Sequence, residues 1–361
     1  MAKLKVGIIG CGGIANSKHI PAIQKIEDVE IAAYCDIIVE RAKNYNEKFS
    51  DGKAKVFEDY KELLKEKLDA VYVCTPNCSH CEITVAALKS GKNVMCEKPM
   101  AMNYAEAQEM IKARDESGKI LTIGYQNRYR PDSFYLKKEC DKGALGEVYF
   151  AKAHALRRRA VPTWGVFIDE KKQGGGPLID IGTHALDLTL HFMNNYEPAY
   201  CVGTTYHKLN KQKEPANAWG PWDTKAFTAE DSAFGFVVMK NGATIVVESS
   251  WALNTIEVRE ASVTLCGDKA GAEMCRDGQG LKINGVKNNA QYIENPTFKA
   301  GGVDYFNGVA SSPADIEAVT FINAVRGKGE LYVKPEEAAV VTRILEGIYT
   351  SAKSGKPYYF D

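Results

Sequence analysis

The chain has 361 residues, of which 45% are hydrophobic and 25% charged. That length is long for one hydrophobic core and predicts two domains. Lysine plus arginine and aspartate plus glutamate each total 46, so the formal net charge is zero. Without a basic excess, we expect neither a nucleic acid nor an anionic membrane surface as partner.

The N-terminal residues 1–5 lead directly into an apolar stretch that is broken by Gly7 and Gly10. This stretch is too short and too rich in glycine for a signal peptide. No apolar run approaches the ~20 residues that a membrane-spanning helix needs. We therefore expect a cytoplasmic protein whose ten cysteines are free thiols rather than disulfides.

A glycine-rich loop follows the first apolar run. Residues 5–9 read as a strand buried on both faces, and residues 10–15 (GCGGIA) match the pattern G-x-G-x-x-A. Gly10 would make the tight turn, Gly12 would let the backbone approach a pyrophosphate, and Ala15 would allow close packing of helix on strand. The alternative is a turn of the same kind that binds no nucleotide.

An acidic residue ends the second predicted strand. Residues 30–35 form this strand, and Asp36 follows it. In that position a carboxylate accepts both hydroxyls of the adenosine ribose and repels a 2′-phosphate. The sequence thus favours NAD over NADP, although Arg41 keeps NADP as an alternative.

Strands and helices continue to alternate up to residue 124. Strands are predicted over 55–57, 70–74, 93–96 and 120–124, and helices over 60–67, 82–90 and 104–117. Ligands of such parallel sheets bind outside the carboxyl ends of the strands. Five polar or glycine positions fall at those ends: Gly10, Asp36, Thr75, Lys98 and Asn127.

Three cysteines in this region have a spacing that permits a second interpretation. Cys74, Cys78 and Cys81 follow the pattern C-x3-C-x2-C, and thiolates so spaced can hold an iron–sulfur cluster. The simpler alternative is that Cys74 ends a buried strand and the other two begin a helix.

The second half of the chain is rich in predicted strands. They cover 148–156, 199–206, 232–239, 243–250 and 262–266, and residues 240–242 (KNG) predict a hairpin turn. We expect a largely antiparallel sheet with one face free to bury against a second copy. Helices are predicted over 313–326 and 335–354.

The loop 157–167 (RRRAVPTWGVF) combines arginines with Trp164. An exposed indole beside Arg157 suits stacking on a sugar ring and binding of its hydroxyls. The alternatives are that Trp164 fills the core and that the arginines form a solvated face.

Residues 174–187 (GGGPLIDIGTHALD) place Asp180 and His184 four residues apart after a glycine-rich bend. On a helix these two side chains would share a face, as an acid/base pair aimed into a cleft would require. Asp187 and His191 extend the stripe, so a metal site is an alternative.

With these motifs the chain resembles the glucose–fructose oxidoreductase / inositol dehydrogenase / rhizopine-catabolism (Gfo/Idh/MocA) family. The resemblance rests on the G-x-G-x-x-A loop, Thr75-Pro76-Asn77-x-x-His80, Glu97-Lys98-Pro99, Asp180-x-x-x-His184 and the tail 354–357. It implies an N-terminal Rossmann NAD-binding domain over 1–124. It further implies a C-terminal α+β domain over 125–361 with a large, mostly antiparallel open sheet, and a homodimer or homotetramer.

The same resemblance implies a pyridine-nucleotide dehydrogenase that acts on a sugar, cyclitol or glycoside. His184 is the expected base, Lys98 the group that stabilises the developing alkoxide, and Asp180 the residue that orients the imidazole or binds a hydroxyl. The predicted substrate contacts are Lys98, Asn127, Arg128, Arg157, Trp164, Asp180 and His184. The predicted cofactor contacts are Gly10, Gly12, Gly13, Ile14, Asp36, Arg41, Thr75, Pro76, Asn77, His80, Glu97, Lys98 and Gln126.

Two other functions fit the same fold. One is a glycosidase that uses bound NAD for transient oxidation, although Thr183-His184 lacks the Tyr-Pro that precedes this dipeptide in such relatives. The other is a non-catalytic NAD-binding regulator, against which Lys98 and His184 both argue.

Overall fold

The computed structural model describes residues 3–213, 216–274, 280–298 and 312–361. The chain divides into two compact units, which we call unit 1 (Met1–Tyr129 and Ser311–Ala339) and unit 2 (Arg130–Ala310 and Val340–Asp361). The predicted boundary at residue 124 lies close to the first crossing point. Residues 311–339, which follow this boundary in the chain, group with unit 1.

Unit 1 is built on a six-stranded parallel sheet with strand order β3-β2-β1-β4-β5-β6. The order reverses direction between β1 and β4, and such a reversal opens a crevice at the carboxyl ends of the strands. This arrangement confirms the predicted Rossmann fold. The strands are β1 (Leu4–Ile9), β2 (Val29–Cys35), β3 (Lys55–Phe57), β4 (Ala70–Val73), β5 (Asn93–Cys96) and β6 (Leu121–Ile123).

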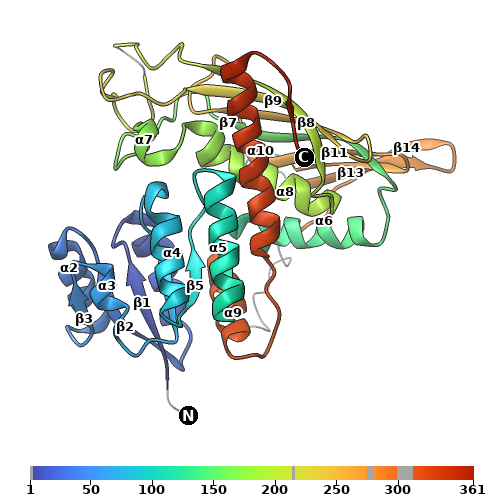
Figure 1. Cartoon of the computed structure of the whole chain (residues 1–361). Coiled ribbons are helices and arrows are strands. Elements are labelled where there is room, and N and C mark those ends of the chain that lie inside the picture. The colour runs from blue at the N-terminus through green and yellow to red at the C-terminus, as the bar shows by residue number, and fades with distance from the viewer. Residues whose placement is uncertain (1–2, 214–215, 275–279, 299–311) are drawn as a thin grey trace. The chain divides into compact units, whose positions relative to one another are not determined.

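Helices flank this sheet, and Figure 1 shows α4 and α5 side by side next to β5. Helix α9, far along the chain, contributes Phe321 and Ile322 to the hydrophobic core beside β1, β2 and β4. The predicted helix over 60–67 is shorter than expected, since α3 ends at Leu63. The helical segments are η1 (Ala15–His19), α1 (Ile20–Gln24), α2 (Val39–Ser50), α3 (Tyr60–Leu63), η2 (Asn77–Ser79), α4 (His80–Lys89), α5 (Tyr104–Ser117), η3 (Gln126–Tyr129), α9 (Pro313–Val325) and the first residues of α10 (Pro335–Ser354).

Unit 2 contains a nine-stranded sheet with strand order β14-β13-β12-β11-β7-β10-β9-β8-β15. Neighbouring strands are antiparallel except β7 and β10, which pair in parallel, so the prediction of a mostly antiparallel sheet is confirmed. The strands are β7 (Val148–Leu156), β8 (Pro198–Tyr206), β9 (Ser232–Met239), β10 (Thr244–Ser250), β11 (Arg259–Gly267), β12 (Ala270–Met274), β13 (Leu281–Lys287), β14 (Ala290–Glu294) and β15 (Tyr358–Tyr359).

Helix α8 packs against β7 and β11 on one face of this sheet. Strand residues that point to this face, such as Val237 and Val247, are fully buried, whereas Phe236 on the other face is 46% exposed. The alternation is that of a sheet covered on one side. The helical segments are α6 (Pro131–Asp141), α7 (Glu170–Gln173), η4 (Leu178–Gly182), α8 (Thr183–Met193) and the remainder of α10.

Among the described residues, none of the helices has both the length and the apolar character needed to cross a membrane.

Candidate active site

The glycine-rich loop has the geometry of a phosphate-binding turn. Gly10 has φ +96°, and a Cβ there would lie 2.6 Å from the carbonyl carbon of Cys74, so only glycine fits. A Cβ on Gly12 or Gly13 would meet nothing within 4 Å. Open backbone at the start of a helical segment is the environment that a pyrophosphate requires, and Ile14 lies exposed beside it.

Asp36 lies at the end of β2, with both carboxylate oxygens held by backbone. Oδ2 accepts from the Cys11 N–H at 2.8 Å and Oδ1 from the Ile38 N–H at 2.8 Å. A carboxylate has further acceptor sites, so this anchoring leaves Asp36 able to accept ribose hydroxyls. Arg41 lies exposed in α2.

His80 connects two of the predicted cofactor loops. Its Nδ1 lies 2.8 Å from the Pro99 carbonyl oxygen and its Nε2 lies 2.9 Å from that of Thr75. Burial lowers the pKa of His80, so we take the ring as neutral, donating to one carbonyl at a time. The contacts tie Thr75, Pro76 and the largely buried Asn77 to the strand end that carries Lys98.

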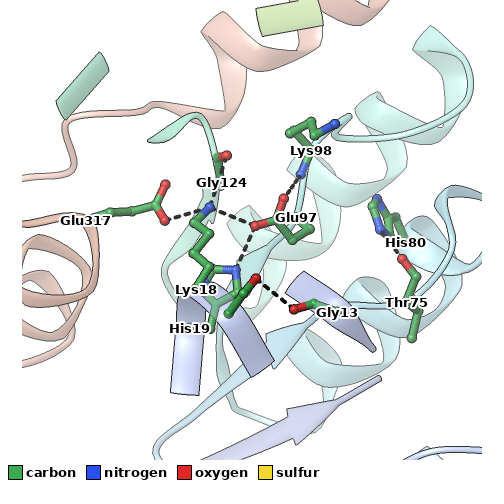
Figure 2. A network of polar contacts seen from close by, with 10 residues as sticks. Gly13, Lys18, His19, Thr75, His80, Glu97, Lys98, Gly124 and Glu317 are labelled. Atoms are coloured by element: carbon green, nitrogen blue, oxygen red, sulfur yellow. Dashed lines mark hydrogen bonds and ion pairs between the residues drawn. The ribbon is translucent and has the colours of Figure 1, made fainter. Parts of the chain in front are cut away.

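Glu97, predicted to contact the cofactor, instead lies inside a buried ionic cluster (Figure 2). Its Oε1 accepts from Lys18 Nζ and lies against His19 Nε2, each at 2.7 Å, and its Oε2 accepts from the Lys98 N–H at 3.1 Å. Lys18 also pairs with Oε2 of Glu317 at 2.8 Å. These contacts give Glu97 a structural role next to Lys98 and leave its predicted cofactor contact without support.

In this cluster one lysine, Lys18, faces two carboxylates, Glu97 and Glu317. Burial raises the pKa of Glu97, but Lys18 and His19 more than offset it and hold the pKa well below its usual range. Burial raises the pKa of Glu317. Burial lowers the pKa of Lys18, yet the two carboxylates outweigh it and raise that pKa. Lys18 is therefore the cation that makes two buried carboxylates tolerable.

The segment after β6 carries Gln126, Asn127 and Arg128 in the short helix η3. Gln126 and Asn127 are half-buried. Arg128 is fully buried, and its Nη1 donates to the Tyr332 carbonyl at 3.3 Å and to Glu337 at 2.5 Å. These contacts hold the returning segment 330–337 and leave the predicted substrate contact of Arg128 without support.

In unit 2, a buried glutamate holds the glycine-rich bend. Glu230 Oε2 accepts from the Gly176 N–H at 2.7 Å, and Oε1 accepts from the Leu178 N–H at 3.3 Å and the Tyr349 hydroxyl at 2.8 Å. A Cβ on Gly176 would lie 2.1 Å from the Glu230 carbonyl oxygen, so glycine is required for this approach. Burial raises the pKa of Glu230 to about 7.

The bend leads into η4, a π-helical turn that contains Asp180. Such turns bond i to i+5, so the regular α-helical spacing predicted for Asp180 and His184 is wrong at its first residue. His184 lies in the first turn of α8 and is half-buried. Asp180 is 9% exposed, and its Oδ2 accepts from the indole N–H of Trp251 at 2.9 Å.

The metal and cluster alternatives find no support. In the part of the chain that the structure describes, no group of three or more His, Cys, Asp or Glu residues could hold a metal ion. This applies to the stripe from Asp180 to His191 and to the cysteines between 74 and 81. The nine described cysteines are free thiols, as predicted, and Cys275 lies outside the described residues.

The predicted sugar loop follows β7. Trp164 is 51% exposed, so the alternative that it fills the core is wrong. Arg157 donates to both carboxylate oxygens of Glu260, at 2.7 and 2.5 Å, and its Nη1 donates to the Ala160 carbonyl at 3.2 Å.

Three residues that position the site escaped the sequence analysis: Lys18, Glu230 and Trp251. Each lies far along the chain from the residue it holds, and only the fold brings them together. For Lys18 and Glu230, the one signal in the sequence was a charged residue placed within an apolar segment.

Comparisons with known proteins agree with this architecture. Residues 4–125 match the family described as "Oxidoreductase family, NAD-binding Rossmann fold" (GFO_IDH_MocA), and residues 137–360 match its "C-terminal alpha/beta domain". The two matches together cover nearly the whole chain.

Several named proteins are similar to this chain. A D-glucoside 3-dehydrogenase of Escherichia coli K12 is 35% identical over 354 residues, which cover 98% of this chain and 96% of the relative. A glucose-6-phosphate 3-dehydrogenase of Bacillus subtilis 168 is 33% identical over 211 residues, 57% of each chain. An oxidoreductase domain protein from Kribbella flavida has the same fold, with a TM-score of 0.85 over both whole chains at 22% identity.

Proposed function

Because the chain belongs to the Gfo/Idh/MocA oxidoreductase family along both of its domains, we propose that this NAD(P)-dependent oxidoreductase oxidises a glucoside at the C3 hydroxyl, with NAD as acceptor. The full-length likeness to the D-glucoside 3-dehydrogenase of Escherichia coli carries this proposal. The Bacillus subtilis relative is likewise named as a 3-dehydrogenase, of glucose 6-phosphate.

The residues of unit 1 fit the cofactor. The open backbone at Gly12 and Gly13 suits the pyrophosphate, and the anchored Asp36 suits the adenosine ribose. When bound, NAD supplies the hydride acceptor. Asp36 favours NAD over NADP, because its charge would repel a 2′-phosphate.

The chain's own residues then handle the proton and the charge. His184 takes the hydroxyl proton as base, since an imidazole titrates near neutral pH. Asp180, fixed by Trp251, orients that imidazole or binds a hydroxyl of the ring. Lys98, on a strand end fixed by Glu97, stabilises the developing alkoxide.

We also propose that two copies associate through the uncovered face of the nine-stranded sheet. Val202, Phe236 and Val246 lie opposite one another on neighbouring strands of that face, and Val202 and Phe236 are 42% and 46% exposed. An apolar row of this kind is typical of an interaction site. Size-exclusion chromatography of Phe236→Asp should give monomers, and an unchanged oligomer would contradict this association.

The function is tested by assaying the protein with NAD and with NADP on four kinds of substrate. These are glucose, methyl glucosides, glucose disaccharides and, separately, inositol. We expect NADH to accumulate with glucosides, and the product to carry a ketone at C3 by NMR. Release of free glucose without net NADH would identify a glycosidase instead, and a ketone at another carbon would refute C3 specificity.

A further inference from the structure

Two exposed indoles lie against each other on unit 2. The ring centroids of Trp164 and Trp219 are 4.9 Å apart at 83°, and the side chains are 51% and 44% exposed. Phe167 packs edge-on against Trp164 at 5.9 Å. Exposed aromatic side chains that gather in this way mark a binding surface.

The loops that carry the two indoles are held together by hydrogen bonds of the backbone, of a threonine hydroxyl and of an asparagine side chain. Ala218 N–H donates to the Arg159 carbonyl at 2.9 Å, and Thr163 Oγ1 donates to the Trp219 carbonyl at 2.8 Å. Asn217 donates to the Val161 carbonyl at 2.9 Å and accepts from its N–H at 2.8 Å. The pair is therefore a preorganised surface, which loses little conformational entropy when a ligand binds.

A short chain of contacts joins this surface to Asp180. The Arg157 guanidinium lies 5.3 Å from the centre of the Trp219 ring, and Arg157 donates to the Ala160 carbonyl. Ala160 N–H in turn donates at 2.9 Å to the carbonyl of Trp251, whose indole holds Asp180. The indole pair thus belongs to the same unit as Asp180 and is connected to it through Arg157, Ala160 and Trp251.

The charge of Arg157 is neutralised within the surface. Arg157 is engaged by both oxygens of Glu260, so the guanidinium presents no unpaired charge to a ligand. A sugar ring could stack its apolar C–H face on an indole and place hydroxyls beside the Arg157–Glu260 ion pair.

We propose that Trp164 and Trp219 form a subsite for a second sugar ring: the ring attached to the glucosyl unit that Asp180 and His184 hold for oxidation. This inference rests on the proposed function. It makes the preferred substrate a disaccharide or larger glucoside rather than free glucose, and it assigns Trp219 a role that sequence did not indicate.

The test compares a glucosyl disaccharide with methyl glucoside in Trp164→Ala, Trp219→Ala and wild-type protein. We expect each variant to lower kcat/KM for the disaccharide about tenfold through KM, since aromatic contacts of this kind contribute on the order of tenfold in affinity. With methyl glucoside both variants should stay within about twofold of wild type. Tyr149→Ala removes a 56% exposed aromatic at the opposite end of β7 and should change neither substrate.

Equal losses on both substrates, or no loss on the disaccharide, would overturn the subsite. Melting temperatures identify any variant that fails to fold, and Trp219→Phe, which keeps a smaller aromatic face, should then recover part of the disaccharide preference. If no sugar yields NADH, the proposed function fails on its own. The subsite is then judged by titrating the quenching of tryptophan fluorescence with a disaccharide, and Trp219→Ala must weaken the apparent affinity about tenfold.

Discussion

The indole N–H of Trp251 donates to the Asp180 carboxylate at 2.9 Å, and both side chains are buried. Trp251 directly follows β10, and Asp180 lies in the π-helical turn before α8. The bond therefore fixes a catalytic candidate to the rigid sheet rather than to its own loop. A site supported in this way keeps its geometry through a reaction cycle.

Replacing Trp251 by Phe keeps most of the ring but removes the donor. Hydrogen bonds to charged groups contribute ~1.5–3 kcal/mol, so we expect kcat to fall about tenfold or more and KM to change little. Steady-state kinetics measure this effect. Trp222→Phe is the matched control, because its buried indole donates to the Asn210 carbonyl at 2.9 Å, a neutral acceptor outside the site. Equal kinetic losses in the two variants would contradict the assignment.

Glu230 predicts a pH dependence of stability. Its folded pKa, raised by burial to about 7, exceeds the ordinary value of 4.5. The neutral carboxyl is thus favoured in the fold, and the corresponding stability is complete below pH 4.5 and lost as pH rises through 7. Relative to Glu230→Gln, whose side chain stays neutral, the free energy of unfolding of the wild type should fall by about 3 kcal/mol between pH 4.5 and 7.

Urea unfolding of both proteins from pH 5 to 8 measures this difference. Parallel stability curves for wild type and Glu230→Gln would show that Glu230 does not titrate in this range. Activity adds a second readout. The Gln variant still accepts from the Gly176 N–H and should keep substantial kcat, whereas Glu230→Ala leaves that donor buried without its acceptor.

Lys18 predicts a large loss of stability in unit 1. In Lys18→Met, Glu97 and Glu317 remain buried without their shared cation, and breaking a buried pair in this way costs ~3–5 kcal/mol. Lys25→Met removes the ion pair with Asp315 from a lysine that is 57% exposed, and should cost ~1 kcal/mol or less. Chemical denaturation compares the two. Restoration of stability by adding Glu317→Gln to Lys18→Met would support the charge explanation; similar losses in the two single variants would exclude it.

Two glycines of the glycine-rich loop 10–15, Gly10 and Gly12, should respond differently when a side chain is added. Gly12→Val adds carbon atoms where the structure has open space, so the fold should persist while the pyrophosphate is obstructed, and the affinity for NADH should fall. Gly10→Ala places a Cβ against the Cys74 backbone and should destabilise the protein itself. Fluorescence titration with NADH and thermal melting separate these outcomes. Normal NADH binding by Gly12→Val would place the cofactor elsewhere.

His184→Ala tests the proposed base. General base catalysis typically contributes ~10²–10⁴-fold, so kcat should fall by that range while NADH binding, a property of unit 1, stays unchanged. A variant with full kcat would remove the assignment. His191 is a buried histidine near the end of the same helix. The control variant His191→Ala should keep the kcat of the wild type once melting curves show that it is folded.

The sequence predicts local features of this protein well. Short apolar runs with glycine or acidic ends locate the strands of unit 1, because strands buried on both faces leave this signature. The strands predicted over 148–156, 199–206, 232–239, 243–250 and 262–266 correspond to β7 to β11. Helix limits are less accurate at α3, where a capping aspartate, Asp59, begins a helix of a single turn.

What the sequence could not predict depends on contacts between distant segments. Glu97 reads as a ligand-facing residue of a motif until Lys18 and Glu317 surround it. Asp180 reads as one position of an α-helix, since nothing in its neighbours specifies a π-turn. Trp219 lies in a long loop, and only the bonds to residues 159–163 bring it to Trp164.

The return of residues 311–339 to unit 1 has a consequence for synthesis on the ribosome. Lys18 is buried against Glu317, and Phe321 and Ile322 complete the core beside β1. An emerging chain that ends before α9 therefore leaves Lys18 and Glu97 without Glu317, and the core beside β1 without Phe321 and Ile322. The nucleotide-binding unit, although first to be translated, finishes folding only after Val325 has left the exit tunnel, and after most of unit 2 has been made.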